Sequence, residues 1–371
     1  MRNPFKPSFG VSPPLLVGRE SLIEEFLEGI DDGPGSPARA TLYTGARGSG
    51  KTALLNAVED AVRTRRWLVV SETATDGFVE RMVHQHLPRL LADFDPRAIK
   101  QRLTGVAGPM GIGSVNWTSI ERHVVEAGLR SQIELLTDLL ADNESGLLIT
   151  LDEVHRQQLP ELRELATTIQ HAFREDREVA FAGAGLQGTV ADVINDDVLT
   201  FLRRAERHHL GRVADADVAR ALLDPIVDSG RTIGDDALKI LVDGADGYPF
   251  LIQLLGYHAW RQNPTVTEIT LDDVRVGVPA AMRRLGALVH EPALGELSDI
   301  DKSFLVAMAK DDGKSKMADV QERLGVDVNY ASQYRLRLIA SELIESAGRG
   351  HVDFALPYLR EYLREHVVGS L

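Results

Sequence analysis

Residues 44–52 read TGARGSGKT, and they constrain the fold of this chain more than any other stretch. From Gly45 to Thr52 they have the spacing G-x-x-x-x-G-K-T, in which glycines let backbone N–H groups approach phosphate oxygens that a Cβ would obstruct. The β-prone run at 40–43 predicts a strand before this loop, and apolar residues at helical spacing over 54–62 predict a helix after it. A strand, a glycine-rich loop and a helix in this order predict a site for nucleotide phosphates.

The side chains of the loop have separate expected tasks. Lys51 is expected to reach the β- and γ-phosphates of ATP, and the hydroxyl of Thr52 is expected to bind Mg²⁺. ATP or ADP and Mg²⁺ are therefore the expected cofactors. The residues of this stretch that we expect to bind the nucleotide are Gly45, Ala46, Arg47, Gly48, Ser49, Gly50, Lys51, Thr52 and Ala53.

A second chemical motif is the sequence GLLITLDEVH at 146–155. Its apolar run predicts a buried strand that carries Asp152 and Glu153 at its C-terminal end, where parallel α/β sheets hold their ligands. An isolated acidic pair is more often a solvated turn, but its combination with the phosphate loop favours a Walker B motif. We therefore expect Asp152 to bind Mg²⁺ and Glu153 to orient the water that attacks the γ-phosphate.

The composition of the chain limits its domain number, its cellular location and its surface charge. The chain of 371 residues is long enough for two or three domains, and its 44% hydrophobic and 26% charged residues are ordinary for a globular protein. It has no cysteine, no start typical of a signal peptide and no apolar run as long as a membrane span, so we expect a soluble cytoplasmic protein without a membrane partner. The net charge of -14 argues against a surface that is basic overall but allows a local basic face.

Two further segments point to a class of ATPase: the sequence VGRE at 17–20 and the sequence GYP at 247–249. Together with the two Walker motifs, they make the chain resemble ATPases with an AAA+-like core and a helical lid, from origin-recognition-type initiators to STAND-class ATPases. In those proteins the first segment lines the adenine pocket, and the proline of a G-x-P motif begins a lid helix that packs on the nucleotide. As bare patterns the two segments also fit an amphipathic helix and an ordinary helix start. The resemblance adds to the nucleotide site Val17, Gly18, Arg19, Tyr248 and Pro249.

The same resemblance implies two polar groups near the γ-phosphate. In related ATPases a polar sensor side chain follows the strand predicted at 179–182, but here the tip at 183–185 reads GAG, and Gln187 is the nearest substitute. An arginine that reaches the γ-phosphate of a neighbouring subunit is assigned to Arg203 or Arg204, with a solvated basic patch as the alternative. Because the sensor is missing, the sequence supports ATP binding better than hydrolysis, and we expect slow turnover.

The C-terminal segment resembles a winged helix-turn-helix. Helices predicted at 301–309, 316–324 and 329–343 precede a Gly-Arg-Gly turn at 348–350 that would form the wing. If Leu336 and its apolar neighbours face the core, the third helix exposes side chains that can reach bases and phosphates. The candidate nucleic-acid residues are Asn329, Gln333, Arg335 and Arg337. Acidic residues nearby leave a protein ligand equally open.

The expected fold is therefore α/β: a P-loop NTPase core with a parallel sheet, followed by an all-helical lid and a winged helix-turn-helix domain. The expected divisions are an N-terminal segment at 1–38, the core at 39–212, the lid at 213–293 and the winged helix at 294–371. Within the core, the apolar glycine-rich stretch at 105–113 is interpreted as a structural insertion, and 120–140 is predicted to be helical.

Two functions fit these features. In the first, ATP held between core and lid fixes the orientation of the winged helix, which binds double-stranded DNA, and hydrolysis or exchange releases it. In the second, the nucleotide is mainly structural, as in a STAND-like regulatory or scaffold ATPase, and the winged helix binds a protein partner in signalling, defence or transposition. An arginine that acts in trans would also require self-assembly. A small-molecule kinase is disfavoured, because a lid of this length followed by a winged helix leaves no evident acceptor site.

Overall fold

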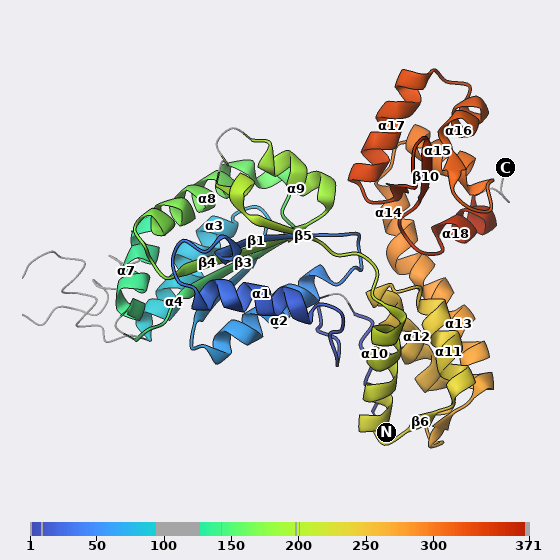
Figure 1. Cartoon of the computed structure of the whole chain (residues 1–371), viewed down its shortest axis with the longest axis horizontal. Helices are drawn as coiled ribbons and strands as arrows, with labels where there is room; N and C mark the ends of the chain where they lie inside the picture. Colours follow the sequence, from blue (N-terminus) through green and yellow to red (C-terminus); the bar gives the residue numbers. More distant parts are fainter. Residues whose placement is uncertain are drawn as a thin grey trace, which may run out of the picture.

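The computed structural model describes residues 2–8, 10–93, 127–141, 143–196, 199 and 201–367. The sheet and its covering helices lie at one end of the longest axis, and the helical lid and the mixed C-terminal region lie one above the other at the other end (Figure 1). The glycine-rich stretch at 105–113 and the first part of the helix predicted at 120–140 lie outside the described residues. Within the described ranges, none of the helices is long and apolar enough to cross a membrane.

The first region is built on a five-stranded sheet in which every neighbouring pair is parallel, so the predicted parallel sheet is confirmed. The strand order is β2-β3-β4-β1-β5, which puts β4 between the strand that precedes the phosphate loop and the strand that ends in the acidic pair. The strands are β1 (Ala40–Thr44), β2 (Leu68–Thr73), β3 (Leu147–Asp152), β4 (Val179–Gly185) and β5 (Glu206–His209).

Helices cover both faces of the sheet, because successive side chains of a strand point to opposite faces. Tyr43 packs with α1 (Glu20–Asp31) and α2 (Lys51–Thr64) on one face. Leu42 packs with the helices of the other face. Those helices are α3 (Phe78–Arg81), α4 (Leu87–Ala92), α7 (Leu129–Ala141), α8 (Leu159–Arg174) and α9 (Gln187–Ile194).

The lid is helical, as predicted, with one addition. Two of the segments that connect its helices pair as short parallel strands, β6 (Thr232–Ile233) and β7 (Glu268–Ile269). The pair forms where buried Arg231 donates to the carbonyl oxygens of Trp260 at 2.9 Å and Asn263 at 3.0 Å, which draws the two connecting segments together. The lid helices are α10 (Asp215–Asp228), α11 (Asp235–Ala245), α12 (Pro249–Gln262) and α13 (Leu271–Leu285).

The N-terminal residues pack on the lid. Phe5 is 2% exposed and belongs to the apolar cluster that fills the lid and continues into the C-terminal region. Its ring lies where a Cβ on Gly256 of α12 would be, so this helix needs glycine at the contact. The amide of Asn3 donates to the carbonyl oxygen of Tyr257 at 3.1 Å. The chain therefore reaches the lid before it enters the sheet.

The C-terminal region combines helices with a three-stranded antiparallel sheet of order β8-β10-β9. Its third long helix, α17, contacts α9 of the first region. A Cβ built on Gly188 of α9 would lie 2.5 Å from the Cβ of Ala340, so the two helices touch closely there. The elements are α14 (Glu291–Gly295), α15 (Asp299–Ala309), β8 (Ser315–Lys316), α16 (Met317–Leu324), α17 (Val328–Ala340), β9 (Ile344–Ser346), β10 (His351–Phe354) and α18 (Leu359–His366).

The helix α17 differs from its prediction in two ways. Leu336 does not face the core: it is 62% exposed, because Ala331 and Leu338 take the buried side. The helix also ends at Ala340 instead of continuing to 343. It stops because Glu342 has a left-handed φ of 55° and the next N–H folds back to the carbonyl oxygen of Leu338 at 3.1 Å, which closes the helix end.

Candidate nucleotide site

The phosphate loop joins β1 to α2. Gly48 and Gly50 have φ angles of 77° and 93°, which glycine adopts without strain. The N–H of Ser49 donates to the carbonyl oxygen of Ala46 at 3.0 Å, and the N–H of Leu54 donates to that of Gly50 at 2.9 Å. The first N–H groups of α2 therefore lie at the mouth of the loop, where a helix favours an anion.

The ammonium of Lys51 lies inside this loop. Its Nζ donates to the carbonyl oxygens of Gly45 at 2.5 Å and Ala46 at 3.0 Å. Burial lowers the pKa of Lys51, whereas the negative charges of Glu342 and Asp152 act to raise it. An ammonium held by neutral carbonyl groups can exchange them for phosphate oxygens, which are stronger acceptors because they are charged.

Ser49 gives a test of whether phosphates fit the loop. It is 4% exposed, and its Oγ has no hydrogen-bond partner within the described part of the chain. A buried polar group without a partner costs roughly 1–3 kcal/mol, which an oxygen of a bound phosphate would relieve. The loop therefore fits the anionic end of a nucleotide.

Thr52 and Asp152 come together from positions 100 residues apart. The hydroxyl of Thr52 donates to Oδ2 of Asp152, and Oδ1 of Asp152 accepts the N–H of Glu153 at 2.8 Å. Across the ranges that the structure describes, no group of three or more His, Asp or Glu side chains is arranged to hold a metal ion by itself. A hydroxyl and a carboxylate beside a phosphate loop are the oxygen ligands that Mg²⁺ uses together with phosphates and water, so the pair fits this ion.

Glu153 lies exposed at the tip of β3 in a left-handed conformation with φ of 56°. A non-glycine residue in this conformation costs about 1 kcal/mol, and such strain is found most often at functional sites. The next N–H, of Val154, donates to the carbonyl oxygen of Ala184 at 2.7 Å, so the chain turns sharply off the strand. The negative charge of Glu153 acts to raise the pKa of Lys51, although burial, which lowers this pKa, is the largest effect.

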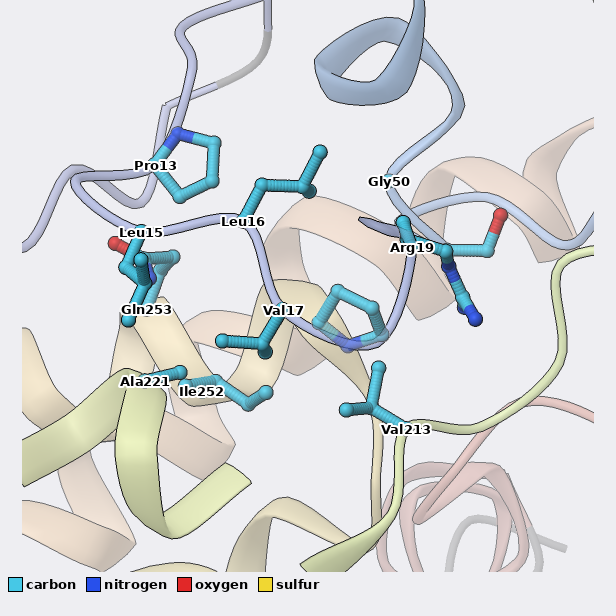
Figure 2. Close-up of a pocket in the computed structure, with 12 residues that line it drawn as sticks. Pro13, Leu15, Leu16, Val17, Arg19, Gly50, Val213, Ala221, Ile252 and Gln253 are labelled. Carbon is cyan, nitrogen blue, oxygen red and sulfur yellow. The ribbon is translucent and has the colours of Figure 1, made fainter. Parts of the chain in front are cut away.

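The VGRE segment borders a small apolar pocket beside the phosphate loop (Figure 2). Val17 is 5% exposed and lies beside Ile252 of α12 (Figure 2). Arg19 holds the segment in place, because its guanidinium donates to the carbonyl oxygens of Gly18 at 3.2 Å and Gly211 at 2.5 Å. The cavity is about 30 Å³, far below the roughly 300–1,000 Å³ of usual ligand pockets, so it is too small for a purine base in this conformation.

The GYP segment lies directly on the phosphate loop. The hydroxyl of buried Tyr248 donates to the carbonyl oxygen of Arg47, and the N–H of Phe250 donates to that of Gly48 at 3.2 Å. A Cβ on Gly48 would overlap the tyrosine hydroxyl, so this approach requires glycine. Pro249 is the first residue of α12. The lid is therefore joined to the loop at the beginning of that helix.

Arg47 also connects the loop to the C-terminal region. Its Nη2 donates to Oε2 of Glu296 at 2.7 Å and to Oε1 at 2.9 Å. The two side chains are 38% and 65% exposed, so solvent screens the pair and its net contribution is about 1 kcal/mol or less. The contact matters chiefly because one loop touches the lid and the residues before α15 at the same time.

The end of β4, which lacks a polar sensor side chain, meets the C-terminal region. The side chain of Gln187 is exposed, but its main-chain N–H donates to Oε1 of Glu342 at 2.5 Å. Glu342 is 5% exposed, and its Oε2 has no hydrogen-bond partner among the residues that the structure describes. Burial raises the pKa of Glu342, while the N–H of Gln187 and the charge of Lys51 act to lower it.

The two candidate arginines have different surroundings. Arg203 donates to the carbonyl oxygens of Ile194 at 2.9 Å and Asp196 at 3.1 Å, so it is held at the end of α9 within its own subunit. Arg204 follows it in a short turn, Leu202–Arg204, and is exposed. Both arginines are exposed, and the hydrogen bonds of Arg203 hold it against the end of α9.

Of the four candidate nucleic-acid residues, the two arginines have partners within the chain and the two amides are exposed. Arg335 donates to the hydroxyl of Ser346 at 3.2 Å. Arg337 pairs with the buried carboxylate of Asp301 at 2.5 Å. The other two are exposed on α17: Asn329 and Gln333. The cations of this helix therefore already have partners, whereas its amides face solvent.

Sequence reasoning missed the contacts that join separate regions. Gln187 and Glu342 are 155 positions apart, and Arg47 and Glu296 are 249 apart, so no local pattern links them. The one signal available was that Glu342 is an acidic residue next to the apolar pair at 343–344, at the end of a predicted helix. Such a residue becomes notable only when its burial is known.

Two family models match the chain. Residues 15–181 match the AAA ATPase domain, a range that includes the VGRE segment, the phosphate loop and the Walker B pair. Residues 287–363 match a domain of unknown function, DUF8462. No match is found among curated protein sequences.

Several solved structures have the same fold over nearly their whole length. The Walker-type ATPase PABY2304 of Pyrococcus abyssi superposes with a TM-score of 0.67 at 16% identity, over 94% of this chain and 96% of that one. The ORC2 protein of Aeropyrum pernix in its ADPNP-ADP complexes gives 0.61 at 15% identity, over 98% and 97%. Its ADP form gives 0.51 at 15% identity, over 99% of both chains. Residues 15–181 are therefore similar to the AAA ATPase domain, and the whole chain has the overall fold of the Walker-type ATPase and of the ORC2 protein.

Proposed function

We propose that this ATPase is a molecular switch in which the bound nucleotide sets the position of the C-terminal region, which binds double-stranded DNA. The observation that carries the proposal is the double attachment of the phosphate loop. The carbonyl group of Arg47 accepts the hydroxyl of Tyr248 from the lid, and its guanidinium pairs with Glu296 before α15. A nucleotide that changes this loop alters both contacts, and only such a differential contact can shift a conformational equilibrium.

We take the C-terminal region to be a winged helix. Its elements follow the order α15, β8, α16, α17, β9 and β10, and the strands form one antiparallel sheet. In this assignment α17 is the recognition helix, and the turn at 347–350 between β9 and β10 is the wing. The assignment supports a nucleic-acid ligand without requiring one, because the same module also binds proteins.

The side chains proposed to contact DNA are those that α17 and the wing expose. Asn329 and Gln333 can reach base edges, and exposed Arg349 at the wing can contact phosphates. Arg335 and Arg337 would first have to exchange their intramolecular partners for phosphate oxygens. Base contacts from the amides and phosphate contacts from the wing are therefore the simplest arrangement.

The proposed chemistry follows from the placement of the Walker residues. Lys51 would hold the β- and γ-phosphates, and Thr52 with Asp152 would hold Mg²⁺, which neutralises phosphate charge when bound. Glu153 would orient the attacking water and accept its proton on the carboxylate. Arg204 of a neighbouring subunit would add positive charge at the γ-phosphate, so rapid hydrolysis would require self-assembly.

A protein partner is the second candidate, as in a STAND-like regulatory ATPase. Val328 is 63% exposed and Leu336 is 62% exposed, and both lie on the outer side of α17. Apolar side chains exposed on a recognition surface are more typical of protein contacts than of the polar floor of a DNA groove. A protein partner that binds the outer side of α17 is therefore the alternative that the DNA titration must distinguish.

The test is a titration of fluorescently labelled duplex DNA, with ATP, ADP or no nucleotide, at two salt concentrations. The switch predicts binding that differs between ATP and ADP and weakens steeply with salt, because phosphate contacts release counterions. Replacing both Asn329 and Gln333 with alanine should weaken it, whereas Gln85→Ala, an exposed amide on the first region, should not. No binding in any nucleotide state would reject the DNA ligand and leave the protein partner.

A further inference from the structure

We propose that the main-chain N–H of Gln187 and the ammonium of Lys51 form the γ-phosphate end of the nucleotide site, and that the carboxylate of Glu342 occupies this end when ATP is absent. The ligand class is the terminal phosphate of a nucleoside triphosphate. The inference rests on the proposed nucleotide switch and names the group through which the switch acts.

The carboxylate of Glu342 lies at the N-terminal end of α9, a position that favours an anion. Its Oε1 accepts the N–H of Gln187 at 2.5 Å, at the first residue of α9, where the helix dipole favours negative charge. The side chain is 5% exposed and lies within electrostatic reach of Lys51. One carboxylate of the C-terminal region therefore accepts the N–H of Gln187 and acts electrostatically on Lys51.

The carboxylate is an incomplete occupant of this place. Its Oε2 has no hydrogen-bond partner among the described residues, and neither has the buried Oγ of Ser49 in the phosphate loop. Lys51 donates to carbonyl oxygens of the loop instead of to the carboxylate. A γ-phosphate has three acceptor oxygens and more negative charge, so it can satisfy the donors that Glu342 leaves without an anion.

A main-chain donor also accounts for the missing sensor side chain. The tip of β4 at 183–185 has no polar side chain, and Gly185 is packed against the carbonyl oxygen of Val154, at 2.7 Å from a built Cβ. Two residues beyond this tip, the main-chain N–H of Gln187 donates to the carboxylate of Glu342 at 2.5 Å. A backbone donor at the start of a helix can take over the contact that a side chain makes in related ATPases.

Displacement of Glu342 would move α17. Glu342 lies two residues beyond Ala340, whose Cβ is 2.5 Å from the position of a Cβ built on Gly188. A carboxylate and a γ-phosphate at one place repel each other, so ATP would separate the end of α17 from α9. ADP lacks the displacing group and would leave the contact intact.

The backbone of Glu342 permits a substitution that removes the carboxylate without harming the fold. Its φ of 55° is the left-handed conformation that glycine prefers at the end of a helix. Glu342→Gly therefore removes both the charge and the backbone strain, and Glu342→Gln removes the charge alone. Glu345→Gln is the matched control, because Glu345 is exposed in the adjacent strand β9.

The experiment is a titration of the full chain with fluorescent ATP and fluorescent ADP, without DNA. If Glu342 occupies the site in most molecules, apparent ATP affinity is reduced by the fraction that is open, so both Glu342 variants should bind ATP about tenfold more tightly. ADP affinity should change less than about twofold in the same variants, and Glu345→Gln should match wild type. Equal tightening for ATP and ADP, or no tightening for ATP, would overturn the proposal.

Ala340→Leu gives an independent check, because it crowds Gly188 and leaves every group of the nucleotide site unchanged. This variant should also bind ATP more tightly relative to ADP than wild type does. A ratio of ATP affinity to ADP affinity equal to that of wild type would argue against coupling through α17. Failure of wild type to bind either nucleotide would reject the nucleotide site itself. Selective ATP tightening without any DNA binding would keep the inference and reject only the DNA function.

Discussion

Replacing His290 with glutamine should remove most of the acid sensitivity of the joint between the lid and the C-terminal region. His290 is 2% exposed, and its Nε2 bonds the carbonyl oxygen of Pro357 at 2.9 Å. Its Nδ1 has no partner among the described residues, so a proton added there would have no acceptor. Burial therefore lowers the pKa of His290 to about 4, although the bond to Pro357 acts in the opposite direction.

The sign and size of the effect follow from proton linkage. The pKa of an unfolded histidine is about 6.5, so between about pH 6.5 and 4 the unfolded chain binds more protons than the folded chain. The stability that neutral His290 contributes is complete above this range and is lost as the pH falls through it. With these two pKa values, the free energy of unfolding should fall by about 2 kcal/mol between pH 7 and 5, and by about 3 kcal/mol at pH 4.

The assay is urea unfolding of wild type and His290→Gln at several values between pH 7 and 5. Glutamine can still donate an N–H to Pro357, but it does not titrate. The wild type should lose about 2 kcal/mol more than the variant over this range. His84→Gln, at an exposed position of the first region, should keep the wild-type slope. Parallel pH profiles for wild type and His290→Gln would refute the reasoning.

Four further outcomes are expected. Lys51→Ala should weaken ATP binding by about a hundredfold, since charged phosphate contacts are lost; unchanged affinity in a fluorescence titration would remove the nucleotide assignment. Glu153→Gln should keep ATP binding but lower phosphate release by about 10²–10⁴-fold, and normal turnover would contradict its role. Tyr248→Phe removes the hydrogen bond to Arg47 and should cost about 1 kcal/mol, seen in urea unfolding as a shifted midpoint. Arg204→Ala should lower turnover only at protein concentrations where subunits associate, and equal loss at high dilution would exclude an action in trans.

The motifs of the candidate site could be recognised in the sequence because each motif is local. The glycine spacing, Lys51 and Thr52 are consecutive, and Asp152 ends an apolar run whose length identifies a buried strand. The structure then brings the Thr52 hydroxyl to the Asp152 carboxylate, as expected from parallel strands that end at one edge of a sheet. The parallel sheet and the helical lid followed from the same periodic patterns.

The contacts that join regions were not predictable in this way. Leu336 fits an apolar helical pattern, yet it is exposed and Leu338 is buried instead. Which side of α17 faces the core depends on how the whole helix packs on its neighbours. The approach of Glu342 to Gln187 depends on how α17 docks on α9, which no spacing in either segment encodes. Long-range docking of this kind is set by the packing of whole surfaces and becomes visible only in three dimensions.

The central claim is that ATP and ADP place the C-terminal region differently relative to the sheet. Because the chain has no cysteine, a donor and an acceptor dye can be attached at Arg174→Cys on α8 and Glu322→Cys on α16, both exposed. The efficiency of energy transfer should be the same without nucleotide and with ADP, and should change with ATP in a Glu153→Gln background that prevents hydrolysis. The same efficiency in all three states would contradict the account.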